Sequence, residues 1–313
     1  MSRTKLPTTE SLVAQVESIA ARAKQHRPRD VAPLSSTAAH ISTKVVTLPL
    51  WPEAVRACPS CVLRSALFGV VKRGRRRYLE RQIIATWADT TIRYTGITLD
   101  QADLDVWLTL LHIAREQGLG TEIQTTIHGL LKALGRCTGK RDHEWLKIVV
   151  ARLTAGTVEI TVGSKTYGGS LIGSFERDEE TKDYRLCLNP KMVVLFEDNA
   201  YTLLEREQRH SLRMDLAKWL HGYILSHQAT AKSPHRIGLE RLRVLCGSET
   251  NELWKFRQQI REAMDELLDA GVVARWSISA NDALEVIRPS RSPQILEGKN
   301  KSEQTLTKTR DSR

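Results

Sequence analysis

Long hydrophobic runs are missing from this sequence. No segment approaches the roughly 18 uninterrupted apolar residues that a membrane-spanning helix requires. The N-terminus, MSRTKLPTTE, also lacks the apolar core of a signal peptide. We therefore expect a cytoplasmic protein that does not enter the membrane.

Cysteine is too scarce and too scattered for a disulfide framework. The chain has five cysteines, an odd number. Cys58 and Cys61 form CPSC, but no βαβ pattern surrounds them, as a redox motif would require. A zinc site would need a second ligand pair, and Cys137, Cys187 and Cys246 stand alone. A redox or metal role is thus the less favoured alternative. We interpret the CPSC cysteines as small residues in a helical stretch and expect neither metal nor cofactor.

Two enzyme signatures are also incomplete. The phosphate-binding motif G-x-x-x-x-G-K-[ST] is absent, and its nearest approach, GGSLIGS (168–174), lacks the lysine that would hold phosphates. The stretch HSLR (210–213) resembles a recombinase motif, which needs a nucleophilic tyrosine well downstream. The last tyrosine, Tyr223, follows too closely for that role. We therefore expect a protein without enzymatic activity.

Negative charge is in deficit. The chain has 47 Lys and Arg residues against 36 Asp and Glu residues, a formal net charge of +11. Such a balance attracts polyanions, with nucleic acid the first candidate and an anionic membrane surface the second. Residues 1–45 have the composition of a flexible segment and linker, and residues 289–313 that of a disordered tail. The part between them has the composition of a globular protein.

An internal similarity in this middle part predicts the architecture. The first copy reads IHGLLKALG and then TGKRDHEWLKIVVARLTAGTVEITVG; the second reads IGLERLRVLCG and then TNELWKFRQQIREAMDELLDAGVV. In each copy a short helix ends at a glycine (Gly135, Gly247), and a second helix ends at another (Gly156, Gly271). A strand rich in β-branched residues follows. This order is typical of a helix-turn-helix with a β-wing.

The predicted class is α+β, with two tandem winged-helix domains at 46–200 and 201–288. In the second copy the wing strands are GVVARWSI and ALEVIRP, joined by the turn SAND. In the first copy the expected strands are TVEITVG, SLIGSF and YRLCLN.

The helix predicted for 250–270 is basic in its first half and acidic in its second. At 100° per residue its apolar residues form one stripe, namely Leu253, Phe256, Ile260, Ala263, Met264 and Leu267. The N-terminal part of a recognition helix enters the major groove, which explains the basic start. The predicted DNA contacts are Lys255, Arg257, Gln258 and Arg261, with Arg243 on the preceding helix as a backbone contact. The alternative is that these are ordinary solvated charges.

The first copy predicts a parallel set of contacts. Its apolar stripe is expected to contain Trp145, Ile148, Val149 and Leu153. Lys140, His143 and Lys147 are expected to point outward, toward DNA. Arg152 falls among the apolar positions, where it either reaches a phosphate or pairs internally.

A basic run, KRGRRR (72–77), lies between two apolar segments and is interpreted as a hairpin turn. Its possible contacts with the DNA backbone are Lys72, Arg73, Arg75, Arg76 and Arg77. A solvated loop is the alternative.

Four stretches resemble the TrfA family of plasmid replication initiators: WPEAVRACPSCVLRSALF, IRYTGITLDQADLDVWLTLL, VVLFEDNAYT and RLRVLCGSETNELWKFRQQIREAMDELLDAGVV. The resemblance covers roughly residues 50–288. It implies two winged-helix domains that bind directly repeated iterons in a plasmid origin as double-stranded DNA and help to melt the adjacent AT-rich duplex. It also implies partners: the host replicative helicase and its loader, the sliding clamp, the host initiator protein, and a second copy in monomer–dimer exchange. The setting would be the bacterial cytoplasm, on plasmid DNA.

The resemblance also suggests a clamp-binding peptide before the first domain. The stretch TLPLW (47–51) offers Leu48, Leu50 and Trp51, two aliphatic anchors and an aromatic side chain that could fill an apolar pocket. Thr47 replaces the glutamine that is usual in the family, and the position is also shifted. The favoured alternative is that these residues begin the domain core.

A transcriptional repressor with two winged helices is the alternative function. Two unlike reading domains in one chain suit an asymmetric direct repeat of about 20 bp, whereas a dimeric repressor with one reading head per chain favours a palindrome.

Overall fold

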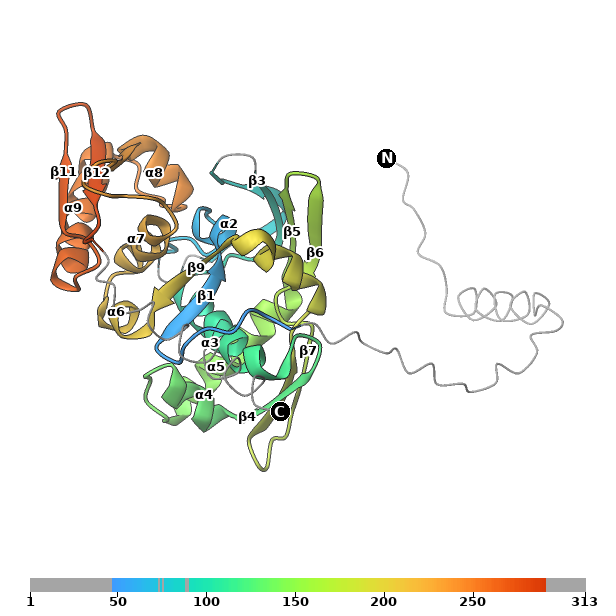
Figure 1. Cartoon of the computed structure of the whole chain (residues 1–313). Helices are drawn as coiled ribbons and strands as arrows, with labels where there is room; N and C mark the ends of the chain where they lie inside the picture. Colours follow the sequence, from blue (N-terminus) through green and yellow to red (C-terminus); the bar gives the residue numbers. More distant parts are fainter. Residues whose placement is uncertain (1–46, 73, 75, 88–89, 291–313) are drawn as a thin grey trace, which may run out of the picture. The chain divides into compact units, whose positions relative to one another are not determined.

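Helices and strands alternate along the chain in a mixed α+β arrangement (Figure 1). The computed structural model describes residues 47–72, 74, 76–87 and 90–290. The elements of the first part are β1 (Val55–Pro59), α2 (Ser60–Leu63), β2 (Tyr78–Ile84), β3 (Thr90–Ile97), α3 (Gln101–Gln117), β4 (Glu122–Thr126), α4 (Ile127–Ala133), α5 (Lys140–Ala155), β5 (Thr157–Val162), β6 (Lys165–Ser170), β7 (Ser174–Arg177), β8 (Asp183–Cys187), the 3₁₀ segment η1 (Pro190–Asn199) and β9 (Tyr201–Glu205). The second part comprises α6 (Arg206–Ser211), α7 (Asp215–Leu225), β10 (His235–Gly238), α8 (Leu239–Leu245), α9 (Leu253–Asp269), β11 (Arg275–Ile278) and β12 (Ala283–Ile287).

The second part is the winged helix that the sequence predicts. Helices α8 and α9 form the helix-turn-helix, and β11 and β12 form the wing, which lies beside α9 in Figure 1. Strand β10 pairs with β12, so the sheet order is β10-β12-β11, antiparallel throughout. The predicted stripe of α9 is confirmed, because its members from Phe256 to Leu267 are buried. The periodicity of this segment alone therefore placed its core face correctly.

The first part repeats this topology with an insertion. Strand β4 precedes α4 and α5, and it pairs with β8 in a sheet of order β4-β8-β7. Between α5 and β7 the chain adds the hairpin β5–β6, which joins β2 and β3 in a separate four-stranded sheet. The strand that directly follows α5 is thus not part of the wing, which is a correction to the expected order. The sequence KTYGGS of β6 was missed because its glycines and exposed residues leave Tyr167 as its one buried side chain.

The stretch SLIGSF was expected to be one strand and is not. It spans the end of β6 and the start of β7, and buried Leu171 and Ile172 lie in the turn between them. In the second wing, the first predicted strand starts later than GVVARWSI suggests. Val272 and Val273 are buried before β11 begins at Arg275.

Matching glycines end the two short helices. Gly135 and Gly247 have φ angles of 66° and 67°, the left-handed conformation that glycine adopts without strain. In both turns the next amide returns to a carbonyl five residues earlier, Arg136 to Leu131 at 2.9 Å and Ser248 to Arg243 at 3.1 Å. The predicted glycine stops of the short helices are therefore confirmed.

Gly156, at the end of α5, serves a different purpose. Its φ is −77°, which any residue tolerates. A Cβ atom at this position would lie 2.5 Å from the hydroxyl oxygen of Tyr94. A glycine is required here for space.

The buried apolar side chains of the described residues form two hydrophobic clusters, one from residues 48–204 and one from residues 212–286. The domain boundary predicted at residue 200 remains a prediction, because all described residues belong to one compact unit. The junction between the clusters is polar and closely packed. Asp105 of α3 accepts from Arg209 at 2.5 Å and from Lys218 at 2.9 Å. The indole of Trp219 donates to the carbonyl oxygen of Ser65 at 3.0 Å.

Candidate nucleic-acid interface

The outward face of α9 carries polar side chains. Residues three and four apart share a helix face, which places Trp254, Gln258 and Arg261 in one row opposite the buried stripe. All three side chains are exposed, and Trp254 is 64% exposed. Arg261 has no hydrogen-bond or ion-pair partner among the described residues. Gln258 donates to Glu262 at 3.2 Å. Both predicted contacts are thus accessible, and their role in binding stays a prediction.

Lys255 lies beside this row. It pairs with Glu252 at 3.3 Å, and its ammonium lies 5.3 Å from the centre of the Trp254 ring. Half of the Lys255 side chain remains exposed, at 50%. A surface pair of this kind is worth little, so Lys255 can exchange its carboxylate for a phosphate at small cost.

Arg257 is engaged within the domain. Its guanidinium pairs with Asp282, in the turn between β11 and β12, and donates to the carbonyl oxygen of Ser279 at 3.4 Å. Asp282 has a φ of 51°, a conformation that few residues other than glycine adopt. Arg257 therefore joins α9 to its wing. To contact a base, as the sequence predicts, it would have to give up this pair.

Arg243 stabilises the turn of the second helix-turn-helix by hydrogen bonds. It donates to the backbone carbonyl of Thr250 at 3.2 Å and also to that of Asn251. These bonds satisfy carbonyls in the segment that leads from α8 to α9. A contact with the DNA backbone stays a prediction for Arg243, beside this structural role.

The three predicted DNA contacts on α5 differ in how exposed they are. Lys140 is exposed at the first position of the helix. His143 does not point fully outward: it is half-buried, and its Nε2 atom is buried without a hydrogen-bond partner among the described residues. Lys147 pairs with Glu144 at 3.1 Å and with Glu179 of the wing at 3.2 Å. Hydrogen bonds to these carboxylates, Glu144 first, raise the pKa of Lys147 above its ordinary value.

The apolar stripe of α5 also differs from the predicted one. Ile148 is 58% exposed, and Leu146 is buried in its place, together with Val149 and Leu153. Arg152 pairs internally with the fully buried carboxylate of Asp103. Of the two outcomes left open for Arg152, the structure shows the internal pair. At 100° per residue Ile148 lies on the side of the helix opposite Leu146, Val149 and Leu153, so the predicted stripe was wrong to include it.

Of the basic run 72–77, the structure describes Lys72, Gly74, Arg76 and Arg77, and Arg77 directly precedes β2. Arg73 and Arg75 lie outside the described residues, so the predicted hairpin turn stays a prediction. Arg76 pairs with Asp100 and with buried Asp103, and it donates to the carbonyl of Thr98 at 2.6 Å. These bonds tie Arg76 to the start of α3, so a contact with a phosphate, which stays a prediction, would require it to give them up.

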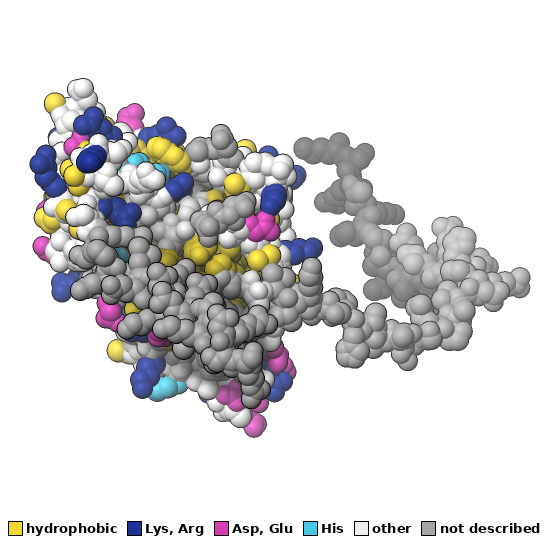
Figure 2. Space-filling view, in the orientation of Figure 1, with side chains coloured by type: hydrophobic (Ala, Val, Ile, Leu, Met, Phe, Trp, Pro, Cys, Tyr) yellow, Lys and Arg dark blue, Asp and Glu magenta, His cyan; other side chains and the backbone are white. Residues whose placement is uncertain are grey.

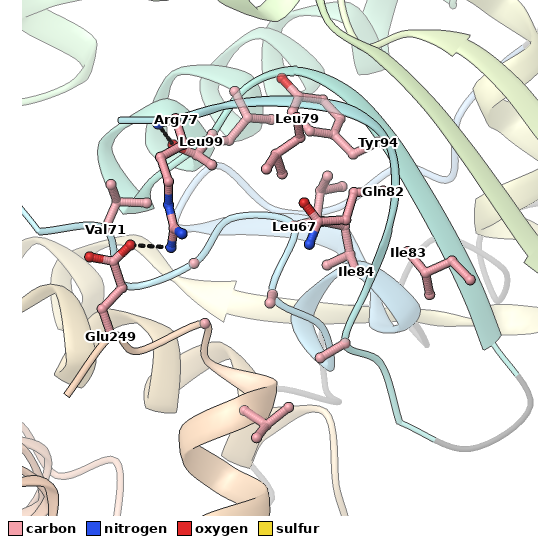
Figure 3. Close-up of a pocket in the computed structure, with 16 residues that line it drawn as sticks. Leu67, Val71, Arg77, Leu79, Gln82, Ile83, Ile84, Tyr94, Leu99 and Glu249 are labelled. Atoms are coloured by element: carbon pink, nitrogen blue, oxygen red, sulfur yellow. Dashed lines mark hydrogen bonds and ion pairs between the residues drawn. The ribbon is translucent and has the colours of Figure 1, made fainter. Parts of the chain in front are cut away.

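Lys72 and Arg77, at the two ends of this run, are exposed. Arg77 forms an ion pair with Glu249 in the turn before α9. A cavity of about 300 Å³ lies beside this pair, lined by segment 66–71, β2, β3 and the turn after α8 (Figure 3). Its charged groups, Arg77 and Glu249, are paired with each other, and its walls include Leu79, Ile84 and Leu99. This lining shows no pair of groups arranged for catalysis.

The segment TLPLW begins the core of the first part. Of the three predicted anchors, Leu48 and Trp51 are 4% and 5% exposed, and Leu50 faces solvent, at 76%. Trp51 stacks on Phe196 with a centroid distance of 6.4 Å, and its indole donates to His112 Nδ1 at 3.0 Å. Two of the three clamp anchors are therefore used internally, which agrees with the favoured alternative and not with a peptide open to a clamp.

Cys58 lies in strand β1, not in a helical stretch, and Cys61 lies in α2. Burial raises the pKa of both thiols, that of Cys61 to about 11, so neither is a reactive thiolate. Within the described ranges, no group of three or more His, Cys, Asp and Glu side chains is placed to hold a metal ion. None of the helices described is both long and apolar enough to cross a membrane.

The two wings differ in charge. The hairpin β7–β8 exposes a run of acidic side chains, namely Glu176, Asp178, Glu179, Glu180 and Asp183. Around the second helix-turn-helix, exposed arginines are found on β10, α8 and β11, at Arg236, Arg241 and Arg275. Figure 2 shows Lys and Arg side chains gathered at the upper left, over the region where Figure 1 places α8, β11 and β12. Exposed arginines thus surround the second helix-turn-helix, whereas the first wing exposes more acidic than basic side chains.

Comparisons with known proteins agree with this geometry. The family described as TrfA protein matches residues 22–287. The chain belongs to the TrfA family. A curated relative, the plasmid replication initiator protein TrfA of Escherichia coli, is 31% identical over 232 residues, which is 71% of this chain and 59% of that protein. The match thus spans less than two thirds of the length of that TrfA protein.

Solved structures similar to this TrfA-family chain support the fold. A crystal structure of domains 2 and 3 of RctB has a TM-score of 0.55 at 11% identity, covering 75% of this chain and 99% of that one. A second structure of RctB domains 2–3 has a TM-score of 0.50 at 10% identity and covers 71% and 95%. At such identities the likeness shows the architecture alone. The predicted winged-helix class is confirmed.

Proposed function

We propose that this protein is a plasmid replication initiator that binds directly repeated sequences of a plasmid origin as double-stranded DNA. The observation that carries the proposal is the pair of helix-turn-helix units with unlike outward faces in one chain: α9 presents Gln258 and Arg261, while α5 presents Lys140 and Ile148. Two unlike helix-turn-helix units in a fixed order recognise an asymmetric DNA site. The family and the name of the curated relative support the same function.

The mechanism that we infer is binding followed by recruitment. Phosphate contacts from basic side chains supply affinity and make it sensitive to salt. Several bound copies strain the neighbouring AT-rich duplex, and host enzymes continue from there, because the chain has no motif for a nucleotide-driven motor. The helicase and its loader, the sliding clamp, the host initiator and a second copy of the chain are the partners of this proposal. Its clamp contact would require a surface other than the buried Trp51.

Selection of bound duplexes from a random pool at physiological salt tests the proposal. We expect an asymmetric motif of about 20 bp, two adjacent turns of DNA. A short palindrome would instead support the transcriptional repressor with a single reading head per chain. If nothing is enriched and salt abolishes binding, the charge acts without specificity and the proposal is wrong.

Arg261→Ala tests the role of α9. Because Arg261 is exposed and has no partner among the described residues, its loss should leave the melting temperature unchanged. If it contacts a base, affinity for the selected duplex falls by about 1–3 kcal/mol, and the preference at one position relaxes. Fluorescence anisotropy at fixed salt measures this. Arg81→Ala, which removes an arginine that is 72% exposed on β2, is the control for the loss of one charge. Equal effects of both substitutions would remove Arg261 from base recognition.

A further inference from the structure

The outward face of α5 is apolar where that of α9 is polar. Ile148 is 58% exposed, and Ala151 and Ala155 are exposed as well. Their spacings of three and four residues place them in one row on the helix surface. The corresponding face of α9 carries Gln258 and Arg261. A branched aliphatic side chain followed by two methyl groups thus faces solvent on a helix whose opposite face is fully packed.

The charges around this row indicate what approaches it. Lys140 and Arg141, at the N-terminus of α5, are exposed. Farther along the helix, Lys147 is held by Glu144 and Glu179. The positive charge that remains available is therefore at the end of the helix that enters the major groove in a helix-turn-helix. The apolar row begins at Ile148, about two turns beyond this basic end. A basic end followed by an apolar row suits the floor of a groove flanked by phosphates better than it suits an acidic or a basic protein surface.

Base pairs present one apolar group in the major groove, the C5-methyl of thymine. Alanine and other small apolar side chains recognise it by contact, and alanines also let the helix backbone approach closely. We propose that Ile148 and Ala151 read thymine methyl groups in the half of the site bound by α5. This inference rests on the proposed binding of double-stranded DNA and adds the chemistry by which the first domain selects its sequence.

The test is a double-mutant cycle, in which the side chain is removed from the protein and the methyl group from the DNA, separately and together, and the binding affinity is measured each time. The probe is the duplex enriched from the random pool, synthesised once with thymine and once with deoxyuridine in the half assigned to the first domain by footprinting. Deoxyuridine keeps the base pairing and lacks the methyl group. For the wild type we expect the deoxyuridine duplex to bind about fourfold more weakly per contacted methyl, the loss of one buried apolar carbon. Ile148→Ala should bind the thymine duplex about tenfold more weakly and should lose most of its preference for thymine over deoxyuridine.

The control is Val162→Ala, because Val162 is an aliphatic residue on β5 that is 44% exposed. It should bind both duplexes as the wild type does, and thermal melting should show both variants folded. If wild type selects a specific duplex but Ile148→Ala loses equal affinity on both probes, or none, the thymine contact is wrong while the proposed function stands. If Ile148→Ala loses binding to a partner protein but binds DNA with unchanged affinity, the row belongs to a protein interface and the inference is wrong. Failure of the wild type to select any duplex removes the proposed function itself.

Discussion

Replacing Asp105 with alanine is expected to lower the free energy of unfolding by about 3–5 kcal/mol, the usual cost of leaving a buried charge without its partner. Arg209 is 3% exposed, and its guanidinium donates to Asp105 Oδ1 at 2.5 Å, to Gln101 Oε1 at 3.0 Å and to the carbonyl of Lys218 at 3.0 Å. Without the carboxylate, no described anion faces this arginine. Because Asp105 lies on α3 and Arg209 on α6, the junction between the two hydrophobic clusters is the part that loosens.

Urea unfolding followed by circular dichroism measures this loss. The matched control is Glu176→Ala, which removes a carboxylate that is 72% exposed and 3.4 Å from Arg185. An exposed pair contributes about 0–1 kcal/mol, so this variant should unfold close to the wild type. If Asp105→Ala also unfolds like the wild type, then the ion pair with Arg209 does not stabilise the junction.

The contribution of Asp105 should depend on pH in a defined direction. Burial pushes the pKa of Asp105 up, but Arg209 and Lys218 together pull it further down, so its net pKa lies below the ordinary value. A carboxyl group with a lower pKa in the folded state stabilises the fold above its unfolded pKa of about 3.9, and this contribution is lost as pH falls through the folded-state pKa. The difference between wild type and Asp105→Ala in unfolding free energy should therefore be full at neutral pH and shrink in acid.

Periodic features of the chain could be predicted from sequence, because they are local. The stripe of α9 and the left-handed glycines Gly135 and Gly247 follow from spacing and from backbone sterics within one turn of chain. The two helices of each copy likewise indicate the winged-helix class, although in the first copy the β-branched strand that follows them is not part of the wing. Strand β5 was expected from TVEITVG, but its place in the fold was not, because the hairpin β5–β6 pairs with β3, in a part of the chain outside the repeat.

Partners of charged side chains could not be predicted, because they are distant in sequence. Arg152 meets Asp103 across 49 residues, Lys147 meets Glu179 across 32, and Arg257 meets Asp282 across 25. A run of arginines shows that charge is present but not which groups neutralise it, and buried charges are paired wherever the fold permits. Several residues predicted to face DNA are for this reason occupied inside the protein. The outward faces of α5 and α9 became clear only when the core faces were known.

Inserting five base pairs between the two halves of the selected site is expected to weaken binding about 1,000-fold, since half of the specific contacts are lost. Five base pairs rotate one half by about half a turn relative to the other. The second winged helix cannot follow this rotation, because Asp105 holds Arg209 and Lys218, and Trp219 donates to Ser65 across the junction.

An insertion of ten base pairs distinguishes a docked pair of domains from a tethered pair. It returns both halves to the same face of the duplex but moves them apart by about one helical turn, roughly 34 Å. Two heads joined by a flexible linker would tolerate this change, whereas heads fixed to each other by buried ion pairs would not. We therefore expect the ten-base-pair insertion to be nearly as harmful as the five-base-pair insertion, as measured by anisotropy on the three duplexes. Recovery to within about threefold of the original affinity, half a kcal/mol or so, would mean that the two winged helices bind DNA independently. In that case the junction would serve stability and not the fixed length of the repeat.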